Sequence, residues 1–276
     1  MNNAILGYQP KNTVIHDMNA LSKLIYFLLT TAALMLTYDV RLIILITCIS
    51  LWCLHLSRVE WKSISFVVKM IIVFSLINLI AIYVLAPEFG PDLYGTRTEL
   101  VHLGGRYSIT SEQLFYEFNL LMKYFATVPL VLVFMLTMNP SEFASSFNRI
   151  GVPYKFAYAI SLTLRYIPDI QNDYLNIRNA QAARGGQSDA DKTIMGKIHR
   201  TLKVVMPLIM TSFNRIDTIS HAMMLRRFGQ QKTRSWYVEK PLKSIDYWVI
   251  SLAVVWFLLF IALLIANGGR YYNPFL

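Results

Sequence analysis

Residues 244–266 read SIDYWVISLAVVWFLLFIALLIA, an almost uninterrupted apolar run that indicates the fold class. Its only charged residue, Asp246, lies close to its start. A helix needs about 20 predominantly apolar residues to cross a bilayer. The stretch therefore predicts a transmembrane helix, which ends where Asn267-Gly268-Gly269 follow.

The composition of the whole chain agrees with that assignment. Of the 276 residues, 55% are apolar and only 15% are charged, and the mean hydropathy is +0.44. Soluble domains carry about 25% charged residues. We therefore expect an all-α integral membrane protein with about five transmembrane helices, whose surroundings are a lipid bilayer and which has no nucleic-acid partner.

Four more apolar segments precede the last one, and the first two are short for a full crossing. They are residues 24–38, 42–56, 64–86 and a segment within 114–138. The fourth contains Glu117 and Lys123, which are too polar to face lipid freely. We expect these two at an interfacial or protein-packed part of the helix, with contact to a partner subunit as the alternative.

Positive charge gathers in one block of the chain. Of 26 Lys and Arg residues, 15 lie in residues 139–240. Because basic segments stay on the cytoplasmic side, we expect this block in the cytoplasm, with the N-terminus inside and the C-terminal tail outside. The expected organisation is a four-span membrane region (1–138), a cytoplasmic coupling-helix region (139–240), and a transmembrane helix with a tail (241–276).

Helical periodicity runs through the basic block. Asn139-Pro140 predicts a helix start and Gly151 a helix end, and a longer helix follows Val152-Pro153. Pro168 and Pro207 should bend the two long helices. Each long helix carries an apolar stripe at steps of three and four residues. The stripes are Ile160, Leu164, Ile167, Ile170, Tyr174 and Ile177, and then Ile209, Phe213, Ile216, Ile219 and Met223.

The chain contains none of the common catalytic or metal-binding motifs. Neither a P-loop nor His-Glu-x-x-His nor Gly-x-Ser-x-Gly occurs, and the five histidines lack ligand spacing. Asp169 and Asp173, four residues apart, are more typical of a solvated helix face than of a metal pair. Cys48 and Cys53 lie in one apolar segment as inert thiols. We expect no catalytic residue, no metal and no cofactor.

Two arginine-centred triplets stand at the predicted ends of the long helices. They are Ala183-Arg184-Gly185 and Leu225-Arg226-Arg227. An arginine near a helix C-terminus interacts favourably with the helix dipole, which explains one triplet simply. A pair of them, each ending a long amphipathic helix, is better explained by binding to partners, because the guanidinium presents a planar, permanently charged set of donors.

The chain resembles a known family over nearly its whole length. It is similar to the transmembrane T component of energy-coupling factor transporters, the vitamin and metal importers of the ABC superfamily. The segments that carry the resemblance are residues 16–23, 149–153, 162–168, 181–185, 206–208 and 222–229.

The resemblance implies a non-catalytic scaffold subunit in a bacterial cell membrane. It would join two ATP-hydrolysing subunits to a small membrane protein that binds the substrate. By position, Arg184 and Arg226 match the arginines that each contact one ATPase. The second triplet departs from the usual Ala-Arg-Gly at Leu225 and Arg227, which leaves both Arg226 and Arg227 as candidates for the contact. The apolar stripes are candidate partner surfaces, with packing inside the subunit as the alternative at each position.

Two other function classes remain open on the residues alone. A self-contained secondary transporter would need functional polar groups within its spans, and often an internal repeat. No repeat is visible, and the spans hold little beyond Lys69, Glu117 and Lys123. A membrane-embedded protein that binds lipid, or an enzyme that acts on it, would use the basic block at acidic headgroups.

Overall fold

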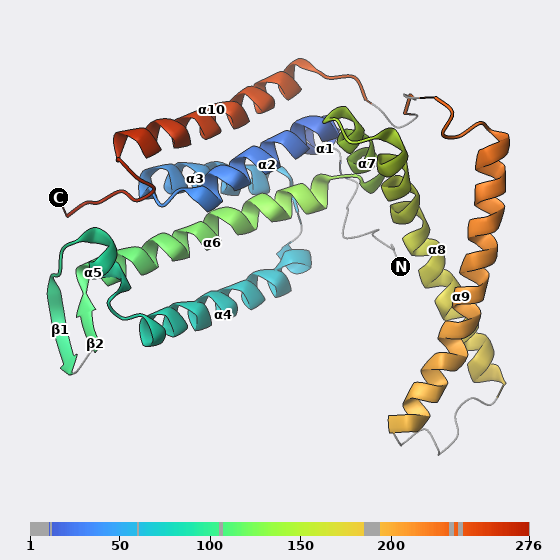
Figure 1. Ribbon diagram of the computed structural model, residues 1–276, viewed down its shortest axis with the longest axis horizontal. Helices are drawn as coiled ribbons and strands as arrows, with labels where there is room; N and C mark the ends of the chain where they lie inside the picture. Colours follow the sequence, from blue (N-terminus) through green and yellow to red (C-terminus); the bar gives the residue numbers. More distant parts are fainter. Residues whose placement is uncertain are drawn as a thin grey trace. The chain divides into compact units, whose positions relative to one another are not determined.

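The computed structural model is almost entirely helical, as expected (Figure 1). It describes residues 11, 13–59, 61–104, 107–184, 194–231, 235–236 and 240–275. Five of its helices are strongly apolar, and three of those are long enough to cross a membrane. The five are α2 (Ala20–Leu36), α3 (Val40–Leu56), α4 (Trp61–Leu85), α6 (Ser111–Thr137) and α10 (Ser244–Ala266).

The chain divides into two compact units. One contains Asn139–Glu239 together with Met1–Leu6, and the other contains Gly7–Met138 together with Lys240–Leu276. The second unit, which we call the bundle, holds all five apolar helices. The membrane and cytoplasmic assignments of the three expected regions stay predictions.

Each apolar helix of the bundle runs opposite to the apolar helix that precedes it in the chain. The first turns of α2 and α10 meet where the backbone N–H of Asn19 donates to Asp246 Oδ1 at 2.8 Å. Their other ends meet where Asn267 Nδ2 donates to Asp39 Oδ2 at 2.9 Å, so α2 and α10 are parallel. The end of α6 returns to the start of α2, because Lys23 Nζ donates to the carbonyl of Thr137 at 3.0 Å. Both connections to residues 139–239 therefore leave the bundle at the end where α2 and α10 begin.

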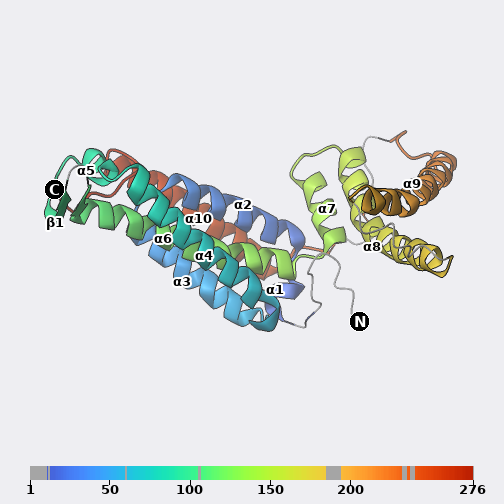
Figure 2. The ribbon, with the colours of Figure 1, turned by 90° about the horizontal axis from the view of Figure 1, so that it is seen from below.

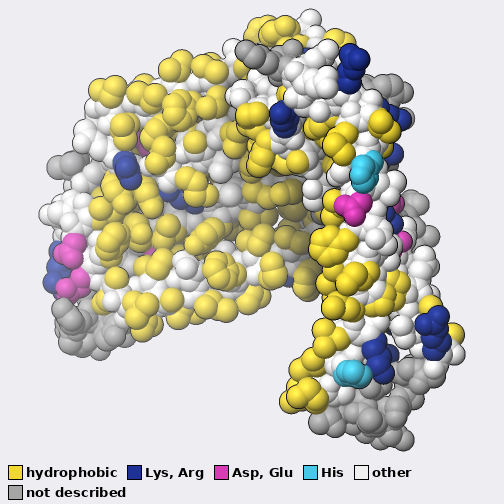
Figure 3. Space-filling view, turned by 45° about the vertical axis from the view of Figure 1, so that its right-hand side comes forward, with side chains coloured by type: hydrophobic (Ala, Val, Ile, Leu, Met, Phe, Trp, Pro, Cys, Tyr) yellow, Lys and Arg dark blue, Asp and Glu magenta, His cyan; other side chains and the backbone are white. Residues whose placement is uncertain are grey.

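The core of the bundle is small and apolar. In Figures 1 and 2, α2 lies beside α10, and α6 packs against α2, α3 and α4. The buried cluster comprises Ala33, Leu34, Leu42, Ile43, Ile46, Ala126, Leu130, Trp256 and Phe260. Hydrophobic side chains also cover much of the outer surface, as Figure 3 shows. A helix that is apolar on all sides is typical of a membrane span.

The first apolar helix begins earlier than the sequence suggested. Expected at residue 24, it starts at Ala20, because the Asn19 side chain accepts a hydrogen bond from the N–H of Leu21 and caps it. Lys23 lies inside this helix, is 7% exposed, and donates to two carbonyl oxygens. At 17 residues each, α2 and α3 span about 25 Å.

The segment expected to be a polar loop, residues 87–111, contains regular structure. A short helix, α5, is followed by an antiparallel pair of strands, β1 and β2. Gly90 is required in α5, because a Cβ there would lie 2.5 Å from the backbone nitrogen of Gln113. The bounds are α5 (Phe89–Tyr94), β1 (Glu99–Gly104) and β2 (Tyr107–Thr110). A four-residue helix, α1 (Val14–Asp17), precedes α2.

The described residues of the other unit, within 139–239, form three helices. The predicted start at Asn139-Pro140 is confirmed, since Asn139 Oδ1 accepts from the N–H of Ser141. The predicted stop is confirmed as well, because Gly151 has a φ of +103°, which favours glycine. Both long helices are continuous through their internal prolines. The bounds are α7 (Pro140–Arg149), α8 (Tyr154–Ala183) and α9 (Ile194–Leu225).

Candidate functional site

The first arginine triplet lies where α8 ends. Ala183 is the last helical residue, and Arg184 is the C-cap, with an exposed side chain. The N–H of Arg184 donates to the carbonyl oxygen of Ala180 at 3.3 Å, which holds the backbone in place. Gly185 lies outside the described residues. The guanidinium therefore extends from a helix end whose backbone is already hydrogen-bonded.

The second triplet closes α9 in a defined hydrogen-bonded turn. Leu225, the last helical residue, is 86% exposed, and Arg226 and Arg227 are also exposed. The N–H of Arg227 donates to Met224 O at 3.0 Å, and the N–H of Phe228 donates to Met223 O at 3.0 Å. This is the bond pattern of a Schellman motif. Arg227 occupies its left-handed position, with a φ of 53°, where glycine is usual.

Aromatic contacts fix the end of α9 beside the start of α8. The ring of Phe228 lies 5.7 Å from that of Tyr154 and 4.7 Å from that of Tyr158, measured between centroids. The two long helices are therefore antiparallel (Figure 1). Because Tyr158 and Arg184 are 26 residues apart on one helix, and Arg226 lies two residues before Phe228, the two triplets are separated by roughly 35 Å. The structure does not bring them together.

An ion pair joins the two long helices between the triplets. Arg215 Nη2 lies 2.6 Å from Asp173 Oδ2, and both side chains are about 70% buried, at 30% and 27% exposure. The guanidinium carbon of Arg215 is 5.7 Å from the ring centroid of Tyr166. The solvated face expected for Asp173 is therefore wrong: this carboxylate binds the neighbouring helix. No metal-binding cluster is found among the described residues.

Both apolar stripes contain exposed and partly buried members. On α8, Ile170 and Tyr174 are about 40% exposed, and the partly buried members are Ile160, Leu164, Ile167 and Ile177. On α9, Ile219 and Met223 are partly buried, and the members that are 41–59% exposed are Ile209, Phe213 and Ile216. The apolar pattern of α9 continues toward the start of the helix, beyond the residues named from the sequence. Its spacing of three and four residues is visible in the sequence. Its additional exposed members are Ile194, Ile198, Leu202 and Met206.

Apolar side chains follow much of the length of α9 in Figure 3. We call the set from Ile194 to Ile216 at these spacings the α9 stripe. In the described part of the chain, nothing covers it fully. An exposed apolar stripe of this length is typical of a surface that binds another protein or a membrane.

Lys123 is packed inside the bundle, in agreement with the protein-packed expectation. Its side chain is 8% exposed, and Nζ donates to the carbonyl of Met35 at 3.2 Å. The same ammonium lies 3.3 Å from the centroid of the Tyr38 ring. Glu117 is partly buried and accepts from Gln113 Nε2 at 3.1 Å. Both charged groups make contacts within the subunit itself.

Comparison with known proteins gives one consistent result. Residues 11–236 match the family model of CbiQ, described as "Cobalt transport protein". The chain is similar to the energy-coupling factor transporter transmembrane protein EcfT of Streptococcus equi, at 26% identity over 89% of this chain and 93% of that protein. It is likewise similar to the EcfT proteins of Lactococcus lactis (24% identity, covering 94% and 97%) and Heliobacterium modesticaldum (27%, covering 82% and 85%).

Proposed function

Because this chain belongs to the CbiQ family and is the transmembrane scaffold subunit of an energy-coupling factor transporter, we propose that Arg184 and Arg226 are its contacts to two ATPase subunits. Residues 139–240 would then lie in the cytoplasm. The observation that carries the proposal is the placement of the two arginines: each is exposed at a helix end, and the ends lie roughly 35 Å apart. That separation suits two neighbouring subunits better than one shared site.

The geometry of the second triplet favours Arg226 over Arg227 as the contact. Arg227 stands in the left-handed position of the helix cap, which the usual Ala-Arg-Gly form fills with glycine. In that register Arg226 is the central arginine, equivalent to Arg184. Leu225 and Ala183 are the last helical residues before them.

We infer a route for force transmission from the antiparallel pair of helices α8 and α9. ATP binding would close the two ATPases and move the helix ends that they hold. The Asp173–Arg215 ion pair lies between those ends, so the helices move as a connected pair. The α9 stripe would pass this movement to a small substrate-binding membrane subunit, for uptake of a vitamin or a metal ion. This chain itself would be non-catalytic.

The secondary-transporter alternative is weakened by the position of Lys123, a charged residue within the spans. Such a transporter requires charged groups available to substrate within the spans. Lys123 instead donates to a main-chain carbonyl and packs on Tyr38. This arrangement favours the scaffold function.

Site-specific photo-crosslinking tests this proposal. In a chain with Cys48 and Cys53 replaced by Ala, a benzophenone is attached at Arg184→Cys or at Arg226→Cys, in the complex co-expressed with its ATPases. Each position should crosslink to an ATPase. Control positions are Arg178→Cys and Lys203→Cys, which are exposed on the same two helices away from the triplets. Equal crosslinking from the controls, or crosslinks from both triplets to lipid only, would contradict the proposal.

A further inference from the structure

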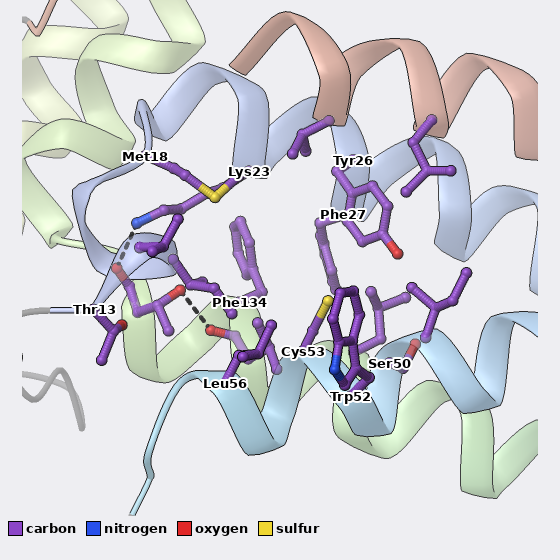
Figure 4. A pocket seen from close by; sticks show the side chains of 18 of the residues that line it. Thr13, Met18, Lys23, Tyr26, Phe27, Ser50, Trp52, Cys53, Leu56 and Phe134 are labelled. Atoms are coloured by element: carbon purple, nitrogen blue, oxygen red, sulfur yellow. Dashed lines mark hydrogen bonds between the residues drawn. The ribbon is translucent and has the colours of Figure 1, made fainter. Parts of the chain in front are cut away.

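A cavity of about 570 Å³ lies in the bundle, at the end where α2 and α10 begin. Its walls come from α1, α2, α3, α6 and α10, and Figure 4 shows the side chains that face it. Most of them are apolar, including Met18, Phe27, Cys53 and Phe134. The volume is in the range of sites that bind small molecules in proteins.

The cavity reaches the outer surface of the bundle. Trp52 belongs to its lining and is nevertheless 64% exposed. In this membrane subunit that outer surface is apolar and faces lipid. Chains of hydrocarbon can therefore enter the cavity from the side, and they recover the dispersion contacts that an empty cavity would lose.

One end of the cavity is cationic. Among the described residues that line it, Lys23 and Arg58 are basic and none is acidic. Lys23 Nζ is held at this end by the carbonyl oxygens of His16 and Thr137, at 3.1 and 3.0 Å. The Arg58 side chain is exposed and forms no ion pair in the described part of the chain.

The backbone at Arg58 is also specialised. Its φ is 49°, in the left-handed region, and its carbonyl accepts from Lys11 Nζ at 2.8 Å. A second hollow shares the lining residues Leu56 and Arg58 with the first. Two apolar spaces thus adjoin a single exposed guanidinium, which is the arrangement required by an amphiphile with two chains and one anionic head.

We propose that this cavity binds an anionic phospholipid, with one acyl chain inside it, the second chain in the adjoining hollow, and the phosphate at Arg58. Charge complementarity selects this occupant over a neutral lipid or an apolar protein helix. Both connections to residues 139–239 leave the bundle at this same end. If those residues are cytoplasmic, the site opens to the leaflet in which anionic lipids are concentrated. The site itself does not depend on ATPase docking.

The experiment uses the complete transporter complex in nanodiscs, probed with phosphatidylglycerol that carries a diazirine in one acyl chain. Peptide mapping should place the crosslinks on α3 around Cys53 and on the facing part of α10. Cys53→Trp fills the cavity and should remove these crosslinks. Cys48→Trp is the matched control, because Cys48 lies on the same helix, is exposed, and does not line the cavity.

Arg58→Gln tests the contact with the lipid headgroup separately from the contact with the acyl chain. Loss of one basic group at a membrane surface should lower the preference for phosphatidylglycerol over an equally photoreactive phosphatidylcholine about fivefold. Val249→Trp, from the opposite wall, should repeat the loss seen with Cys53→Trp and decides the matter if that variant does not fold.

Three results would overturn the proposal. Equal crosslinking in the Cys53→Trp and Cys48→Trp variants would mean a general lipid shell without a site. An unchanged lipid preference in Arg58→Gln would remove the headgroup contact. A photoreactive group at Cys53 that crosslinks to a partner protein, and not to lipid, would identify a protein as the occupant.

Discussion

Asp173 of α8 and Arg215 of α9 form an ion pair of 2.6 Å, and each precedes the arginine of its own triplet by eleven residues. The pair therefore divides the antiparallel helices into two arms of equal length, each about 16 Å long and ending in Arg184 or Arg226. Two equal arms on one junction are suited to carrying movement between two similar partners.

Breaking this junction should uncouple the arms without unfolding the bundle. A partly buried pair contributes about 1 kcal/mol, and removal of one partner leaves the other charge partly desolvated. We expect Asp173→Ala to reduce substrate uptake more than ATP hydrolysis. The charge-reversed double variant, Asp173→Arg with Arg215→Asp, should recover part of the uptake. A double variant no better than the single one would show that the pair is not the junction.

The two arginines of the triplets should act through partner binding. Arg184→Ala together with Arg226→Ala should abolish uptake and reduce the ATPase that copurifies with the membrane subunit, since truncating a buried charged contact costs about 2–5 kcal/mol. Membrane insertion should be unchanged. Arg178→Ala with Lys203→Ala removes the same charge from the same helices and is the control. Full uptake by the first variant in vesicles would refute the assignment.

Arg227 should be replaceable by glycine with a gain in stability. A non-glycine residue in the left-handed conformation costs about 1 kcal/mol, which glycine avoids. Arg227→Gly should therefore retain uptake and ATPase binding and raise the thermal midpoint of the complex slightly. Arg226→Gly should lose ATPase binding. If Arg227→Gly alone uncouples transport, then Arg227 and not Arg226 is the contact.

The α9 stripe should bind the substrate-binding subunit. Ile198, Met206 and Phe213 are each at least half exposed, so polar replacements there leave no cavity in the fold. We expect Met206→Glu with Phe213→Glu to reduce copurification of that subunit while the ATPases remain bound. Thr201→Glu with Thr218→Glu adds the same charges at exposed positions outside the stripe as a control. Loss of the ATPases instead would assign the stripe to them.

Lys123 should be dispensable for transport. Lys123→Met keeps most of the side-chain volume but leaves the carbonyl of Met35 without this donor, at a cost of about 1–3 kcal/mol in stability. Uptake at permissive temperature should persist, with a lower thermal midpoint. A stable Lys123→Met protein that binds its partners and yet lacks uptake would favour a substrate pathway through the spans.

Features that depend on residues close together in the chain could be read from the sequence. The long apolar helices, the start at Asn139, the stop at Gly151 and the positions of both arginines at helix ends could all be predicted. Hydrophobic periodicity and helix capping act over about four residues, so a single chain segment contains them completely.

Contacts between residues far apart in the chain become visible only in the folded molecule. The contact of Phe228 with Tyr158 sets the two triplets apart, and Asp173 finds its partner 42 residues away. The burial of Lys123 against Tyr38 likewise comes from a different helix. The physical reason is that these contacts depend on how whole helices pack, and neither the spacing nor the composition of one segment specifies the surface of another.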